Sequence, residues 1–117
     1  MSPQHHNPSR PQEISPVDAY ARSRAGEAVL LDVREEEAHA AAPDAVLLPL
    51  RLLAMNAPLS PGIGERPVLC VCQSGRRSRQ AAGILTTRGA RAWKVPGGMQ
   101  AWAQADLPVR TGPGQVT

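Results

Sequence analysis

The sequence predicts an α/β domain with a central parallel β-sheet that has helices on both of its faces. Short apolar runs alternate with segments that carry helix signals, which is typical of parallel βαβ units. The chain has 117 residues, which fits one domain, and its 42% hydrophobic content argues against global disorder. The best apolar run, 67–72, ends in a cysteine at the carboxyl end of a predicted strand, where parallel sheets place their sites.

The chain is expected to begin with a disordered tail over 1–12, which is followed by the domain over 13–112. Ser15 caps a helix whose first residue is Pro16, and Gly26 ends it. The further elements expected before the first long loop are strands over 28–33 and 46–48 and helices over 35–41 and 50–56. The proline- and glycine-rich stretch 57–66 is that loop.

The C-terminal half repeats the alternation. The elements expected there are a strand over 67–72, a tight loop over 73–76, a helix over 77–88, a strand over 92–95, a turn over 96–98 and a helix over 99–105. The segment 107–109 closes the domain, and 113–117 is a tail.

Charge and composition narrow the classes of function. The net charge is +3, which favours small anionic substrates. The basic residues are scattered apart from Arg76, Arg77 and Arg79, which have no aromatic platform beside them, so nucleic-acid binding is not expected. No apolar run reaches the length of a membrane span, and the first eleven residues form no signal core, so a cytoplasmic location is expected.

The two cysteines are the strongest chemical signal. Cys72 stands between a buried strand and the start of a helix, where unpaired backbone N–H groups, the helix dipole and nearby arginines favour thiolate over thiol. The alternative is that Cys72 is a buried cysteine that merely ends a strand. Cys70 lies within the strand and is interpreted as a small buried hydrophobe, with a resolving thiol as the alternative. At this spacing the pair predicts neither a disulfide nor a zinc site.

Three segments, in order, resemble the rhodanese family. The loop Cys72-Gln73-Ser74-Gly75-Arg76-Arg77-Ser78 resembles its active-site loop, with four residues between the cysteine and an arginine. The segment 30–35, Leu-Leu-Asp-Val-Arg-Glu, resembles an upstream hallmark, and 95–102 with 107–109 resembles a C-terminal one. The chain departs from the family at 40–45, where Ala-Ala-Ala-Pro-Asp-Ala replaces a glycine–histidine–isoleucine stretch.

The resemblance implies a single-domain sulfurtransferase of α/β fold that needs no metal or organic cofactor. Cys72 would take a sulfane sulfur from a small anionic donor, thiosulfate or a low-molecular-weight persulfide, and pass it to cyanide, a thiol or a partner protein. Arg77 would orient the loop or the donor, and Arg76 is either a donor contact or a solvated side chain. The residues that would shape the cradle are Ser74, Gly75 and Ser78.

Three further loop and strand-end residues have roles implied by the same resemblance. Gln73 stands where many relatives carry a cation. Asp32 and Arg34 match a segment near the site and receive a supporting role, although a buried Asp–Arg pair can also be purely structural.

Two other functions remain as alternatives. A cysteine phosphatase or arsenate reductase also uses a cysteine and an arginine in one loop, but needs five residues between them, whereas Arg77 follows Cys72 after four and Ser78 comes next. A noncatalytic binding module of the same fold is the alternative from another class.

Overall fold

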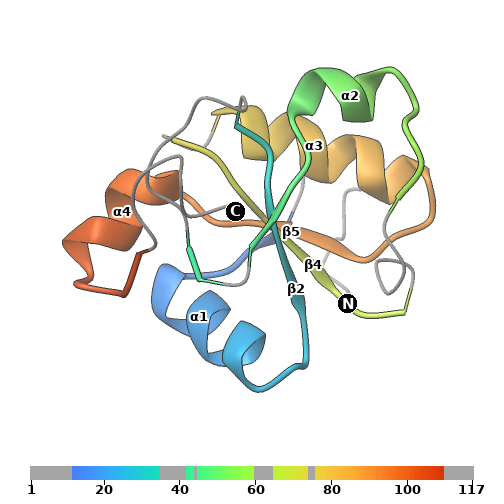
Figure 1. The fold of residues 1–117 in the computed structure, drawn as a ribbon. Helices are drawn as coiled ribbons and strands as arrows, with labels where there is room; N and C mark the ends of the chain where they lie inside the picture. The colour runs from blue at the N-terminus through green and yellow to red at the C-terminus, as the bar shows by residue number, and fades with distance from the viewer. Residues whose placement is uncertain (1–11, 35–41, 44, 60–64, 74–75, 110–117) are drawn as a thin grey trace, which may run out of the picture.

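The structure, a computed structural model, describes residues 12–34, 42–43, 45–59, 65–73 and 76–109 (Figure 1). The helix expected over 35–41, the tail up to residue 11 and the tail over 113–117 lie outside the described residues.

Five parallel strands form one sheet in the order β1-β5-β4-β2-β3. The strands are β1 (Gln12–Glu13), β2 (Val29–Asp32), β3 (Val46–Leu47), β4 (Val68–Val71) and β5 (Ala92–Lys94). The helices are α1 (Pro16–Arg24), α2 (Leu50–Ala54), α3 (Arg76–Thr87) and α4 (Gly98–Gln104). The predicted fold class is confirmed.

The helices cover both faces of the sheet, two on each (Figure 1). Alternating side chains of β4 divide between two cores: Val68 and Cys70 pack with α2 and α3, whereas Leu69 and Val71 pack with α1 and α4. A strand covered on both faces is buried at every position, and this explains the uninterrupted apolar runs in the sequence. Trp102 of α4 is fully buried and meets Tyr20 of α1 edge to face, with the ring centroids 5.9 Å apart.

Most elements lie where the sequence predicts them. Ser15 caps α1 as expected, because its Oγ accepts a hydrogen bond from the backbone N–H of Asp18 at 3.1 Å. The helix expected from 77 begins one residue earlier, at Arg76, and the helix expected from 99 begins at Gly98.

Strand β1 is a difference from the prediction, which placed residues up to 12 in a disordered tail. Gln12 pairs with Trp93 of β5, and the backbone N–H of Ile14 donates to the carbonyl of Lys94 at 3.0 Å. A two-residue strand is too short to carry a hydrophobic period, and it exists because β5 offers an edge for pairing.

The strand order places a switch point between β2 and β4. From β2 the chain continues to β3 on one side of the sheet, and from β4 it continues to β5 on the other. In open parallel sheets, ligands usually bind at the carboxyl ends of the strands beside such a switch point, and Cys72 directly follows β4 there. In the described part of the chain, no helix is long and apolar enough to cross a bilayer.

Candidate active site

The sulfur of Cys72 lies at the start of α3. Cys72 directly follows β4, and its side chain is 2% exposed. Its Sγ accepts a hydrogen bond from the backbone N–H of Ser78 at 3.3 Å, and the Ser78 Oγ lies 3.6 Å from it. Ser78 is the third residue of α3, so this N–H is among those that have no partner within the helix. The sulfur therefore occupies the place where a helix N-terminus receives an anion.

The backbone of the cysteine loop is held by α4. The backbone N–H of Met99 donates to the carbonyl of Cys72 at 2.7 Å, and that of Gln100 donates to the carbonyl of Gln73 at 3.1 Å. Two helix N-termini thus converge on the loop: α3 contacts the sulfur and α4 contacts the carbonyls.

Gly98 makes this close approach possible, and its role was not foreseen from the sequence. Its φ is +55°, and a Cβ at this position would overlap the carbonyl group of Cys72. Gly97 precedes it with a φ of +76°. The pair of glycines after β5 was interpreted only as a turn, although two successive glycines at the carboxyl end of a strand are a signal of close backbone approach.

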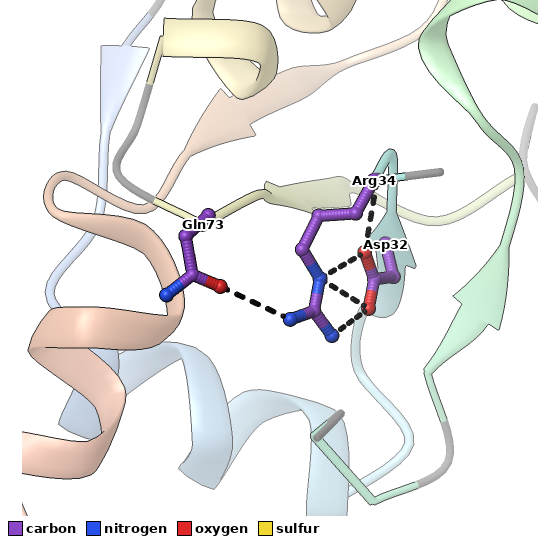
Figure 2. A network of polar contacts seen from close by, with 3 residues as sticks. All are labelled: Asp32, Arg34 and Gln73. Carbon is purple, nitrogen blue, oxygen red and sulfur yellow. Dashed lines mark hydrogen bonds and ion pairs between the residues drawn. The ribbon is translucent and has the colours of Figure 1, made fainter. Parts of the chain in front are cut away.

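Asp32, Arg34 and Gln73 form a polar network that joins the ends of β2 and β4 (Figure 2). The Arg34 guanidinium donates to Asp32 Oδ2 from Nη2 at 2.7 Å, and its Nε donates to Oδ1 at 3.0 Å. The Arg34 backbone N–H donates to Oδ1 as well, at 3.0 Å. The remaining nitrogen, Nη1, donates to Oε1 of Gln73 at 3.3 Å.

The ion pair of Asp32 and Arg34 is buried although it carries two charges, whereas Gln73 is exposed. Asp32 is 3% exposed and Arg34 is 6% exposed. A buried ion pair is tolerated when its geometry is good and its other hydrogen-bonding groups are satisfied, and both conditions hold here. The pair thus links the end of β2 to Gln73, the residue next to Cys72.

The structure describes only some of the other residues predicted for the cysteine loop. Arg76 and Arg77 are exposed in the first turn of α3, whereas Ser74 and Gly75 lie outside the described residues. Cys70 is fully buried in β4, where burial first and the neighbouring Cys72 second raise the pKa of its thiol far above the ordinary value. Among the described residues no three His, Cys, Asp or Glu side chains are grouped so as to hold a metal ion.

A family model described as "Rhodanese-like domain" matches residues 15–105. The chain belongs to the rhodanese-like domain family. The match runs from the cap of α1 to just beyond α4 and so includes every element that builds the cysteine site. The predicted family is confirmed.

Named relatives of this rhodanese-like domain agree with that assignment. A protein named "Sulfurtransferase" from Allochromatium vinosum is 37% identical over 84 residues, which are 69% of this chain and 77% of the relative. "Thiosulfate sulfurtransferase GlpE" from Actinobacillus pleuropneumoniae is 30% identical over 85% of this chain and 93% of the relative. The crystal structure of a rhodanese homolog from Thermus thermophilus superposes with a TM-score of 0.66 at 30% identity, covering 77% of this chain and 99% of that one.

Proposed function

We propose that this rhodanese-like domain is a sulfurtransferase that carries a sulfane sulfur as a persulfide of Cys72. The observation that carries the proposal is the hydrogen bond from the Ser78 backbone N–H to Sγ of Cys72 at 3.3 Å, at the N-terminus of α3. The same setting suits a thiolate, which attacks, and a persulfide anion, which must be held. The relatives named sulfurtransferases support the reaction class.

The first step loads the sulfur. The Cys72 thiolate attacks the sulfane sulfur of thiosulfate, the S–S bond of the donor breaks, and sulfite leaves with the bonding electron pair. A low-molecular-weight persulfide would react in the same way and release a thiolate. The exposed guanidinium groups of Arg76 and Arg77 lie in the first turn of α3 and would attract such an anionic donor.

The second step unloads the sulfur. An acceptor nucleophile, which can be cyanide, a thiol or a partner cysteine, attacks the outer sulfur of the persulfide. The S–S bond breaks, and its electron pair returns to Sγ as the thiolate. The enzyme alternates between two covalent states, which is ping-pong catalysis.

Gln73 distinguishes this loop chemically. Its side chain is neutral, and its Oε1 accepts a hydrogen bond from Nη1 of the buried Arg34, so this position supplies no positive charge of its own. A buried guanidinium that is already paired with Asp32 attracts an exposed dianion less than a free cation would. We therefore expect a weaker preference for thiosulfate and a relatively better use of a low-molecular-weight persulfide.

Steady-state kinetics test the proposal. Initial rates are measured at several fixed concentrations of cyanide while thiosulfate or glutathione persulfide is varied. Parallel double-reciprocal lines are expected for the wild type and no turnover for Cys72→Ser, whereas Cys70→Ala keeps turnover. Intersecting lines, or turnover that survives in Cys72→Ser, would exclude the Cys72 persulfide. No turnover with any donor and acceptor would favour the noncatalytic binding module.

A further inference from the structure

A groove between α2 and α3 has no assigned role. Helices α2 and α3 lie side by side on one face of the sheet (Figure 1). An open groove of about 790 Å³ runs along the outer side of α3, from Arg76 past Arg79 and Gly83 to Thr87, with Leu50 and Ile84 as its apolar part. A second hollow of about 240 Å³ shares Ile84 and Thr87 with it and reaches Arg88, so the two form one surface, here called the α3 groove.

The charged residues that line the α3 groove, among those that the structure describes, are all arginines: Arg76, Arg79 and Arg88. Helix α3 also carries Arg77 and contains no aspartate or glutamate. Arg76 and Arg79 line the groove and are exposed. A basic rim around apolar side chains fits a partner that is both acidic and apolar.

Gly83 provides a second observation. It lies in the interior of α3, where glycine costs about 1 kcal/mol relative to alanine. A Cβ added at Gly83 would meet nothing within 4 Å, so no packing within the described molecule requires a glycine there. Because Gly83 also lines the groove, the missing side chain leaves room for something that approaches α3 closely.

Arg88 provides a third observation. Its Nη1 is buried and has no hydrogen-bond partner among the described residues. A buried charged donor without an acceptor is costly, and this guanidinium adds positive charge at its end of the groove. Arg88 directly follows the last residue of α3 and lines the far end of the same groove, about two and a half helical turns beyond Arg79.

We propose that the α3 groove docks an acidic, amphipathic segment of a protein that accepts sulfur from Cys72. The inference rests on the proposed function for the identity of the partner as an acceptor. The groove starts at the end of α3 whose Ser78 N–H holds the sulfur, so a docked segment brings a cysteine toward the persulfide. The partner thiolate attacks the outer sulfur, the S–S bond breaks, and Cys72 leaves as the thiolate.

The test uses short synthetic peptides as acceptors. The acidic peptide has glutamate and leucine at helical spacing and one terminal cysteine. Its controls replace glutamate by lysine, or leucine by serine. The persulfide form of the full chain is mixed with each peptide, and the rate of sulfur transfer is compared with transfer to cyanide. The acidic, leucine-containing peptide is expected to react about tenfold faster than either control at low salt, with the advantage falling as salt is added.

Two variants locate the effect. Arg79→Glu reverses a charge on the rim, and Gly83→Leu fills the floor with a good helix former. Both are expected to slow transfer to the acidic peptide about tenfold and to leave transfer to cyanide unchanged. Gly83→Ala, whose added methyl meets open space, is the matched control, and thermal unfolding checks that each variant is folded.

The outcomes separate this inference from the proposed function. If sulfur is transferred to cyanide, and the acidic and lysine peptides react at equal rates, the docking role of the α3 groove is wrong. The proposed sulfurtransferase function is then unaffected. If no acceptor reacts, the docking role is tested by the binding of a fluorescent acidic peptide that has serine in place of cysteine. Selective binding that Arg79→Glu abolishes supports docking in the α3 groove. The absence of selective binding overturns it. A dimer that Arg79→Glu dissociates, without peptide binding, would assign the groove to a second copy of the chain and overturn the proposal.

Discussion

The backbone N–H of Ser78 donates to Sγ of Cys72 at 3.3 Å, and the hydroxyl of the same serine lies 3.6 Å from that sulfur. Ser78 is fully buried, so water cannot replace either group. Ser78, a residue of α3, thus contributes both its backbone and its side chain to the surroundings of the sulfur.

Ser78→Ala removes the hydroxyl and keeps the N–H. We expect kcat/KM for sulfur transfer to fall about threefold to tenfold, because one hydrogen bond contributes about 0.5–1.5 kcal/mol. Steady-state kinetics measure this effect, and Ser23→Ala in α1, on the other face of the sheet, is the control. If both variants retain wild-type kcat/KM, the hydroxyl has no part in the reaction.

Gly98→Ala is expected to destabilise the domain by at least about 3 kcal/mol, because it combines an unfavourable positive φ with an overlap on the carbonyl of Cys72. Gly26→Ala separates the two causes: its φ is +75° but its Cβ would meet nothing within 4 Å, so a loss of about 1 kcal/mol is expected. Urea unfolding gives both values. Equal losses for the two variants would mean that α4 does not need its close approach to the cysteine loop.

Arg34→Met leaves Asp32 buried without its cation and is expected to lower the free energy of unfolding by about 3–5 kcal/mol. The double variant Asp32→Leu, Arg34→Met removes both charges and should regain most of that stability. Sulfur transfer by the double variant should nevertheless stay impaired, because Gln73 has lost the Nη1 donor that holds it. Wild-type transfer in a stable double variant would reduce the network to a structural role.

The buried thiol of Cys70 gives a pH dependence of stability. Its pKa in the folded protein is raised, so at alkaline pH the unfolded chain ionises this thiol while the folded chain keeps it protonated. This contribution is therefore fully present below about pH 8.5, the ordinary thiol pKa, and is lost as the pH rises above it, by about 1 kcal/mol per pH unit.

Urea unfolding of the wild type and of Cys70→Ala from pH 7 to pH 10.5 measures this loss, and the difference between them cancels the other titrating groups. We expect the wild type to be the more stable at pH 7 and its advantage to shrink above about pH 9. An advantage that is constant across the range would mean that Cys70 ionises equally in both states.

The sequence predicts the elements of this fold where the local signals are strong. The apolar run of β4 and the Ser15–Pro16 start of α1 have clear local causes, a strand covered on both faces and a capped first turn, and both are confirmed. Strand β1 depends instead on pairing with β5, which is distant in the sequence. Its two residues, Gln12 and Glu13, therefore show no local pattern that predicts a strand.

The candidate site shows the same division. The position of Cys72 after a buried strand and before a helix follows from local patterns. Arg34 contacts Gln73, which is 39 residues away in the sequence, and Gly98 lies against the carbonyl of Cys72, which is 26 residues away. A local sequence pattern does not predict contacts between such distant residues. Arg34 and Gly98 were therefore interpreted as a supporting residue and as part of a turn.

The most direct test of the account is the intact mass of the reduced protein after incubation with thiosulfate and, separately, with glutathione persulfide. We predict a gain of one sulfur atom with at least one donor, present in Cys70→Ala, absent in Cys72→Ser and reversed by cyanide. No gain with either donor, in protein whose Cys72 thiol is shown to be free, would contradict the assignment of Cys72 as a persulfide carrier.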